Sequence, residues 1–228
     1  PWLELKASDL PAAWQREYAN ALAASPGAEK EWRSPGLFAV GKIVRAFERA
    51  RTELGADRTR IAAGTWGFEF LRASDRFFPP CVPLLGLDYD VIHERPQLGT
   101  AESRAVIAEV GAHRPVIPIV WAQHDDGHYL GRPYTPLPEF CSKLADARAA
   151  GFGVIHWTTR PLDLYFASLA RQVCADTKDE PLSATCDAFA AQELGEPALG
   201  PYLQRWITEA PRFARETGMR IAFAHVST

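Results

Sequence analysis

The sequence predicts an α/β protein in which parallel strands are joined by helical crossovers and followed by a helical C-terminal region. Three observations predict this fold class. Apolar stripes with helical spacing alternate with short β-rich runs from about residue 36 onward. The runs are apolar almost throughout, which is typical of parallel strands that are covered on both faces. After Trp157 the helical stripes continue with no strand between them.

Four strands are expected, near residues 59–64, 84–92, 115–121 and 153–157. Glycines at 55, 111 and 151 follow three of the helical stripes, and glycine favours a helix end because it adopts the left-handed conformation easily. The third run is predicted as a strand although Pro118 lacks the N–H that a central strand donates. A further helix is expected around Leu10, Trp14, Tyr18 and Leu22.

Four strands with crossovers make about half of a (β/α)₈ barrel, which typically needs about 250 residues. The sequence therefore predicts either a smaller open sheet or the second half of a barrel, and a chain that starts at Pro1 favours the second. We expect an N-terminal helix and linker over 1–35, a partial catalytic barrel over 36–160, and a helical region over 161–228. A signal peptide could have been removed, which slightly favours a secreted or periplasmic location.

Composition argues against several function classes. The 228 residues include 25 Lys and Arg against 28 Asp and Glu, so no basic field attracts nucleic acid. No apolar run approaches the roughly 20 residues that span a bilayer, so membrane insertion is not expected. The four cysteines form no Cys-x-x-Cys pair and are expected to be mostly small core residues. Without a phosphate-binding glycine motif, no cofactor is expected, and no bound metal either.

Polar and aromatic residues gather where the predicted strands end. In parallel α/β folds the carboxyl ends of the strands carry the chemistry, so these residues are the candidate site. Asp88 and Asp90 share one face of the second run, where a barrel-lining acid could lie. The other candidates follow the first, third and fourth runs: Trp66 and Glu69; His124, Asp125, Asp126, His128, Tyr129 and Arg132; His156, Trp157 and Arg160.

Carboxylates beside aromatic rings are typical of glycoside hydrolysis, in which one carboxyl group protonates the leaving oxygen and another acts as base or nucleophile. We expect Asp125 or Asp126 to be the general base, because adjacent carboxylates disfavour simultaneous ionisation. Glu69 is the expected acid, since nearby aromatic residues would raise its pKa. The alternative for Glu69 is the first turn of a helix.

The remaining candidates are expected to bind a carbohydrate substrate. Indole and phenol rings stack on the apolar faces of sugars, and guanidinium groups bind carboxylates in bidentate geometry, which suits a uronic acid. The stacking residues are Trp66, Tyr129 and Trp157, and the residues that contact hydroxyl or carboxylate groups are His124, His128, His156, Arg132 and Arg160.

Three alternatives remain open. The run from His124 to Tyr129 could be a solvated loop. His124, Asp126 and His128 could instead hold a metal in a metal-dependent hydrolase or lyase. The protein could also bind carbohydrate without catalysis.

Two segments, from Ile117 to Tyr129 and from Gly151 to Trp157, resemble the closing strands of bacterial glycoside hydrolases with a (β/α)₈ catalytic barrel. The most similar are the α-glucuronidase families that trim xylan, in which a helical region like that from Leu162 to Glu216 follows the barrel. The resemblance implies polysaccharide degradation by an inverting hydrolase. It also implies a carboxylate base at Asp125 or Asp126 and a clamp of basic residues for the uronate.

Overall fold

A computed structural model describes residues 5–24, 34–65, 67–88, 97–123, 139–156 and 163–217. For Glu69, Trp121, Gln123, His156 and residues 210–217 it describes the backbone alone. The chain divides into two compact units, unit 1 (Pro1–Ile119 and Leu144–Gly153) and unit 2 (Val120–Lys143 and Val154–Thr228). The fold is mixed α/β, as the sequence predicts.

A four-stranded parallel sheet has the strand order β1-β2-β3-β4. The strands are β1 (Ala63–Thr65), β2 (Leu84–Asp88), β3 (Val116–Gln123) and β4 (Gly153–His156). In the register of the first pair, Ala63 lies opposite Leu84 and Thr65 opposite Gly86. Each of the four predicted runs contains a strand, and Pro118 lies fully buried inside β3.

The first strand is shorter than the sequence predicts, because it begins at Ala63 and not near residue 59. One residue earlier, the register would place Ala62 opposite Pro83, which has no N–H for the ladder. The pairing is continued by a single bond from the Ala63 N–H to the Pro83 carbonyl, 3.0 Å long. The proline before β2 therefore sets where β1 starts.

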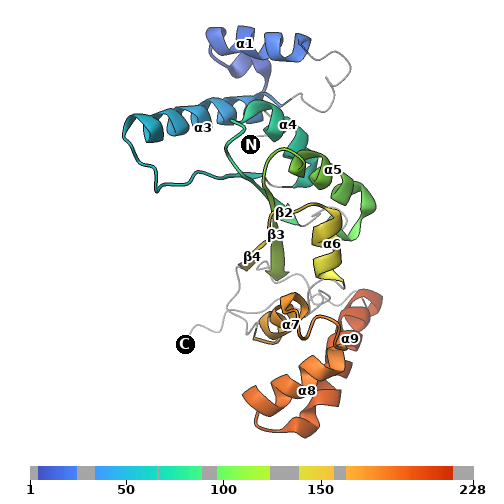
Figure 1. Ribbon diagram of the computed structural model, residues 1–228. Coiled ribbons are helices and arrows are strands. Elements are labelled where there is room, and N and C mark those ends of the chain that lie inside the picture. The colour runs from blue at the N-terminus through green and yellow to red at the C-terminus, as the bar shows by residue number, and fades with distance from the viewer. Residues whose placement is uncertain are drawn as a thin grey trace, which may run out of the picture. The chain divides into compact units, whose positions relative to one another are not determined.

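The helices of unit 1 are α1 (Ala12–Ala23), α3 (Pro35–Glu53), α4 (Leu71–Phe77) and α5 (Ala101–Gly111). Ser34 caps α3 by accepting a hydrogen bond from the Leu37 N–H, with Pro35 in the first turn. Figure 1 shows α3 and α4, which pack against each other. Buried apolar side chains form the core of this unit, among them Phe68, Leu71, Leu84, Leu98, Ile107, Val110 and Val116.

Two of the three predicted glycine helix ends are confirmed, and the third, at Gly151, is wrong. Gly55 does take a left-handed φ of 60° just after α3, as expected. Gly111 is the last residue of α5, where an added Cβ would lie 3.0 Å from the Arg148 carbonyl oxygen. Helix α6 (Phe140–Asp146) ends well before Gly151, and Arg148 takes the positive φ there. Gly111 is thus explained by close packing against residue 148. After α6 the left-handed conformation is taken by Arg148 and not by Gly151.

In unit 2, α7 (Asp163–Val173), α8 (Leu182–Glu193) and α9 (Gly200–Thr217) follow one another without a strand in the part that the structure describes. Helix α8 packs against both α7 and α9, and buries Cys186 and Ala190. The prediction that most cysteines lie in the core is wrong, because Cys81, Cys141 and Cys174 are exposed.

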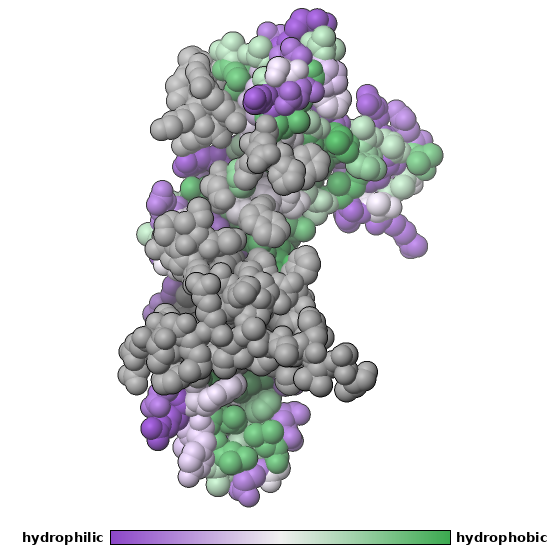
Figure 2. Space-filling view, turned by 180° about the vertical axis from the view of Figure 1, so that it is seen from behind, coloured by the Kyte–Doolittle hydropathy of each residue, from purple (hydrophilic) through white to green (hydrophobic). Residues whose placement is uncertain are grey.

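Large apolar side chains also reach the surface. Ile43, Phe47 and Leu54 are exposed on or just after α3, and Figure 2 shows hydrophobic residues among hydrophilic ones on the molecular surface. None of the described helices combines the length and the hydropathy that a bilayer span requires.

Candidate active site

The carboxyl ends of β1 and β2 lie side by side in unit 1 and carry a network of buried polar groups. β1 ends at Thr65, and its hydroxyl donates a hydrogen bond of 3.0 Å to the Gly67 carbonyl. The short 3₁₀ helix η3 (Phe68–Phe70) follows and leads directly into α4. The chain thus turns sharply from the sheet into a helix at this edge.

Phe68 fixes the segment that follows β1. Its ring is 1% exposed and lies against the backbone of Gly86 in β2, where an added Cβ would be 2.6 Å from the ring. The Phe68 N–H donates a hydrogen bond to the side-chain oxygen of Gln97, at 3.2 Å. Glycine at 86 is therefore required by a close approach, and the segment is tied to the one that follows β2.

Asp88 is the last residue of β2 and has only 2% of its surface exposed. One of its carboxyl oxygens accepts a hydrogen bond of 2.7 Å from the Leu98 N–H, and the Gln97 N–H also stabilises its charge. Burial acts in the opposite direction and dominates, so that the pKa of Asp88 is raised from 3.8 to about 7. This carboxyl group can therefore change its charge near neutral pH.

The partners of Asp88 belong to the 3₁₀ helix η4 (Gln97–Gly99), which comes just before α5. Thr100 caps α5 by accepting from the Ser103 N–H at 3.2 Å, and its hydroxyl donates to the Gln97 carbonyl at 3.0 Å. Arg104 donates to the Leu98 carbonyl at 2.6 Å. The first turn of α5 thus holds η4 in place over the acid.

Most of the predicted site residues lie outside the described part of the chain. These are Trp66, His124, Asp125, Asp126, His128, Tyr129, Arg132, Trp157 and Arg160, together with Asp90. Glu69 lies in η3 immediately before α4, and His156 is the last residue of β4, but both side chains are outside the described ones. Their roles stay predictions.

Three of the described strands end directly before a predicted site residue. β1 ends directly before Trp66, β3 ends directly before His124, and β4 ends directly before Trp157. β3 and β4 are neighbours in the strand order, and the carboxyl-terminal parts of both strands belong to unit 2.

Sequence reasoning missed Gln97 and offered Asp88 only as one of two possible barrel-lining acids, without a catalytic role. The signal for Asp88 was present, because an acid that closes an apolar strand at its carboxyl end is placed where parallel folds carry reactive groups. No such signal marks Gln97, whose place depends on the loop after β2. Among the described residues, no cluster of histidine, cysteine and acidic side chains could hold a metal ion.

Comparison of the chain with protein-family models, with curated proteins and with solved structures gave no match. The functional argument therefore depends on the chemistry of the site.

Proposed function

We propose that the chain is a glycoside hydrolase in which Asp88 is the general acid. The observation that carries the proposal is the buried carboxyl group at the end of β2, whose pKa is about 7. Such a group keeps its proton at slightly acidic pH and in part at neutral pH, and can transfer it to a glycosidic oxygen. In this proposal Asp88 replaces Glu69 as the acid, while Asp125 or Asp126 keeps the role of base.

The strand order supports a barrel as the parent fold. Doubly wound sheets reverse their strand order at a switch point, whereas the strands of a (β/α)₈ barrel follow one another around the sheet. The order β1-β2-β3-β4 is sequential and has no reversal. We propose that these strands correspond to the second half of such a barrel.

The proposed reaction uses two carboxyl groups. Asp88 donates its proton to the leaving oxygen as the bond from that oxygen to the anomeric carbon breaks. The base, Asp125 or Asp126, takes a proton from the water whose oxygen forms the new bond to the anomeric carbon. Asp88 is then ionised and the base is protonated, and proton exchange with solvent restores both.

We propose a substrate that contains a uronic acid, in an oligosaccharide or polysaccharide. The support is the sequence around the strand ends, where Arg132 and Arg160 would bind the uronate and Trp66, Tyr129 and Trp157 would stack on sugar rings.

The test is an assay of the full chain on uronic-acid-decorated xylo-oligosaccharides and on aryl glycosides and aryl glucuronides, with Asp88→Asn, Asp125→Asn and Asp126→Asn variants. Loss of the general acid should lower kcat on the oligosaccharides by about 10²–10⁴-fold. Dinitrophenyl substrates should be nearly unaffected in Asp88→Asn, because their leaving group departs without a proton. Asp57→Asn is the control, since Asp57 is an exposed acid of the same unit.

Other results would contradict the proposal. Equal loss on both substrate classes would show that Asp88 is not the acid. Turnover that disappears with a chelator and returns with a stoichiometric metal would favour the metal-dependent alternative. Sugar binding without any turnover would favour a carbohydrate-binding protein.

A further inference from the structure

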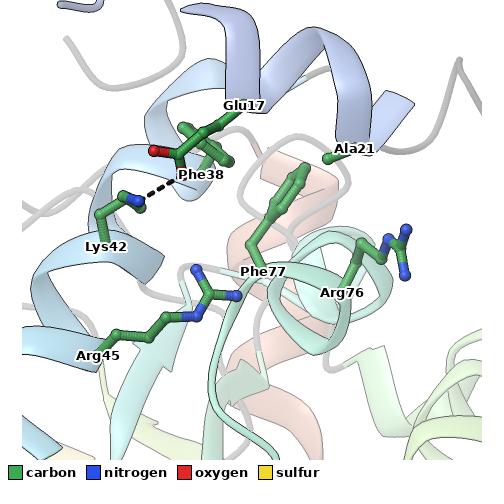
Figure 3. A pocket seen from close by; sticks show the side chains of 7 residues that line it. All are labelled: Glu17, Ala21, Phe38, Lys42, Arg45, Arg76 and Phe77. Atoms are coloured by element: carbon green, nitrogen blue, oxygen red, sulfur yellow. Dashed lines mark hydrogen bonds and ion pairs between the residues drawn. The ribbon is translucent and has the colours of Figure 1, made fainter. Parts of the chain in front are cut away.

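A pocket lies among three helices of unit 1, and none of the candidate active-site residues lines it. It has a volume of about 430 Å³, within the range of small-molecule sites. Figure 3 shows its walls, with Glu17 and Ala21 from α1, Phe38, Lys42 and Arg45 from α3, and Arg76 and Phe77 from α4.

One wall of the pocket is aromatic. Tyr18, Phe38 and Phe77 form a buried cluster with ring centroids 5.3–6.0 Å apart. Gly41 allows α3 to pack closely on α4, because a Cβ at this position would overlap the Phe77 carbonyl. The cluster is therefore held by backbone packing, and only the small exposed edges of Phe38 and Phe77 reach the pocket.

The polar side of the pocket is lined by three basic residues and one acid. Lys42 is ion-paired with Glu17, and its ammonium group also lies 5.8 Å from the centre of the Trp14 ring, so its charge is already compensated. Arg45 is exposed and makes no hydrogen bond or ion pair with any residue that the structure describes. In Figure 3 its guanidinium group points toward the space between Lys42 and Phe77.

Arg76 adds a second guanidinium group on the other side of Phe77. A guanidinium group beside an apolar wall binds an oxyanion in bidentate geometry while the rest of the ligand leaves water.

We propose that this pocket binds a small organic oxyanion, a carboxylate or phosphate ester that carries an apolar ring. Arg45 holds the anionic group and the ring lies against Phe77. The Lys42–Glu17 ion pair has no net charge, so Arg45 is the cation that holds the anionic group.

The pocket is separate from the site at the sheet edge. Arg76 and Phe77 form the end of α4 from which the chain leads to the start of β2, whereas Asp88 is the last residue of that strand. The two sites share no residue, and the proposal does not depend on the proposed hydrolase activity.

The experiment measures binding to the full chain by isothermal titration calorimetry, with 1-naphthyl phosphate and 1-naphthoate as the organic oxyanions. 1-Naphthol supplies the ring without the charge, and inorganic phosphate supplies the charge without the ring. We expect at least one of the two oxyanions to bind about tenfold or more tightly than either partial probe, the factor that corresponds to one charge-assisted contact.

Two variants locate the binding. Arg45→Gln should weaken it about tenfold or more, because it removes the guanidinium group. Ala21→Leu should weaken it similarly by filling the pocket without changing its charge. The control is Arg49→Gln, an exposed arginine on the same helix that does not line the pocket, and it should change Kd less than about twofold. Circular dichroism confirms that each variant is folded.

The proposal is overturned if neither oxyanion binds more tightly than naphthol, or if inorganic phosphate binds equally well. It is also overturned if Arg45→Gln binds like the wild type, or if Arg49→Gln weakens binding as much as Arg45→Gln does.

Discussion

The Phe68 N–H donates a hydrogen bond to the side chain of Gln97. Leu98, the residue after Gln97, donates its own N–H to the Asp88 carboxyl group. Two consecutive residues after β2 thus hold both the segment that follows β1 and the buried acid at the end of β2. The position of the first segment and the charge of Asp88 therefore depend on the same short 3₁₀ helix.

Replacing Gln97 by Leu should reveal how much this link contributes. The side chain is 9% exposed, so its loss leaves the Phe68 N–H without its partner in a buried place. We expect the free energy of unfolding to fall by about 1–3 kcal/mol, measured by urea denaturation. Gln192→Leu, at an exposed position of α8, should change it by less than about 0.5 kcal/mol. Equal effects would show that the hydrogen bond is unimportant.

Asp88→Asn should change how stability depends on pH. The folded pKa of about 7 lies above the unfolded value of 3.8, so between these pH values the folded state holds a proton that the unfolded state has lost. Wild-type stability should therefore fall as pH rises through this window, with a slope of up to about 1.4 kcal/mol per pH unit from this group. The variant lacks that contribution and should become more stable than the wild type toward pH 8. Urea denaturation at pH 5, 6, 7 and 8 measures the difference, and parallel curves would contradict the raised pKa.

Gly86→Ala should destabilise unit 1, because the new methyl group would lie 2.6 Å from the Phe68 ring. Overpacking of this kind costs about 1–3 kcal/mol. Gly64→Ala in the neighbouring strand is the matched control, since an added Cβ there meets nothing within 4 Å. A smaller side chain at 68 should relieve part of the cost, so a double-mutant cycle with Phe68→Leu should show coupling. Additive effects would place the strain elsewhere.

Arg114→Met should be more damaging than the loss of a surface ion pair. Arg114 is 4% exposed, lies with its Nε 2.7 Å from an oxygen of Asp75, and donates to the Phe78 carbonyl. Its removal leaves Asp75 without this partner, and we expect a loss of about 3–5 kcal/mol in thermal or urea denaturation. Arg72→Met, which breaks a more exposed pair with Glu109, should cost less than about 1 kcal/mol.

The sequence predicts the order of elements well, because hydrophobic periodicity is a local signal. All four predicted runs contain strands, and the predicted helical region after Trp157 contains α7, α8 and α9. Helix ends were harder to predict. Gly111 is needed for contact with residue 148, which is distant in sequence, and Arg148 itself takes a left-handed conformation that its residue type does not suggest.

In the candidate site, too, local features could be predicted from the sequence and features that depend on distant contacts could not. An acid at the carboxyl end of a parallel strand is visible in the sequence, so Asp88 could be noticed there. Its raised pKa could not be predicted, because it results from burial that outweighs the opposing hydrogen bond from the Leu98 N–H, ten residues away. Asp125 and Asp126 can be placed after β3 from the sequence alone, and their roles remain predictions.

The brevity of β1 affects how the protein behaves at high concentration. β1 is one of the two edge strands of the sheet in the described residues and has only three residues, so it offers few free backbone groups to a strand from another molecule. A short edge strand is a common protection against strand-to-strand aggregation. Pro83, which lies opposite Ala62, limits the pairing of β1 beyond its first residue because it has no N–H.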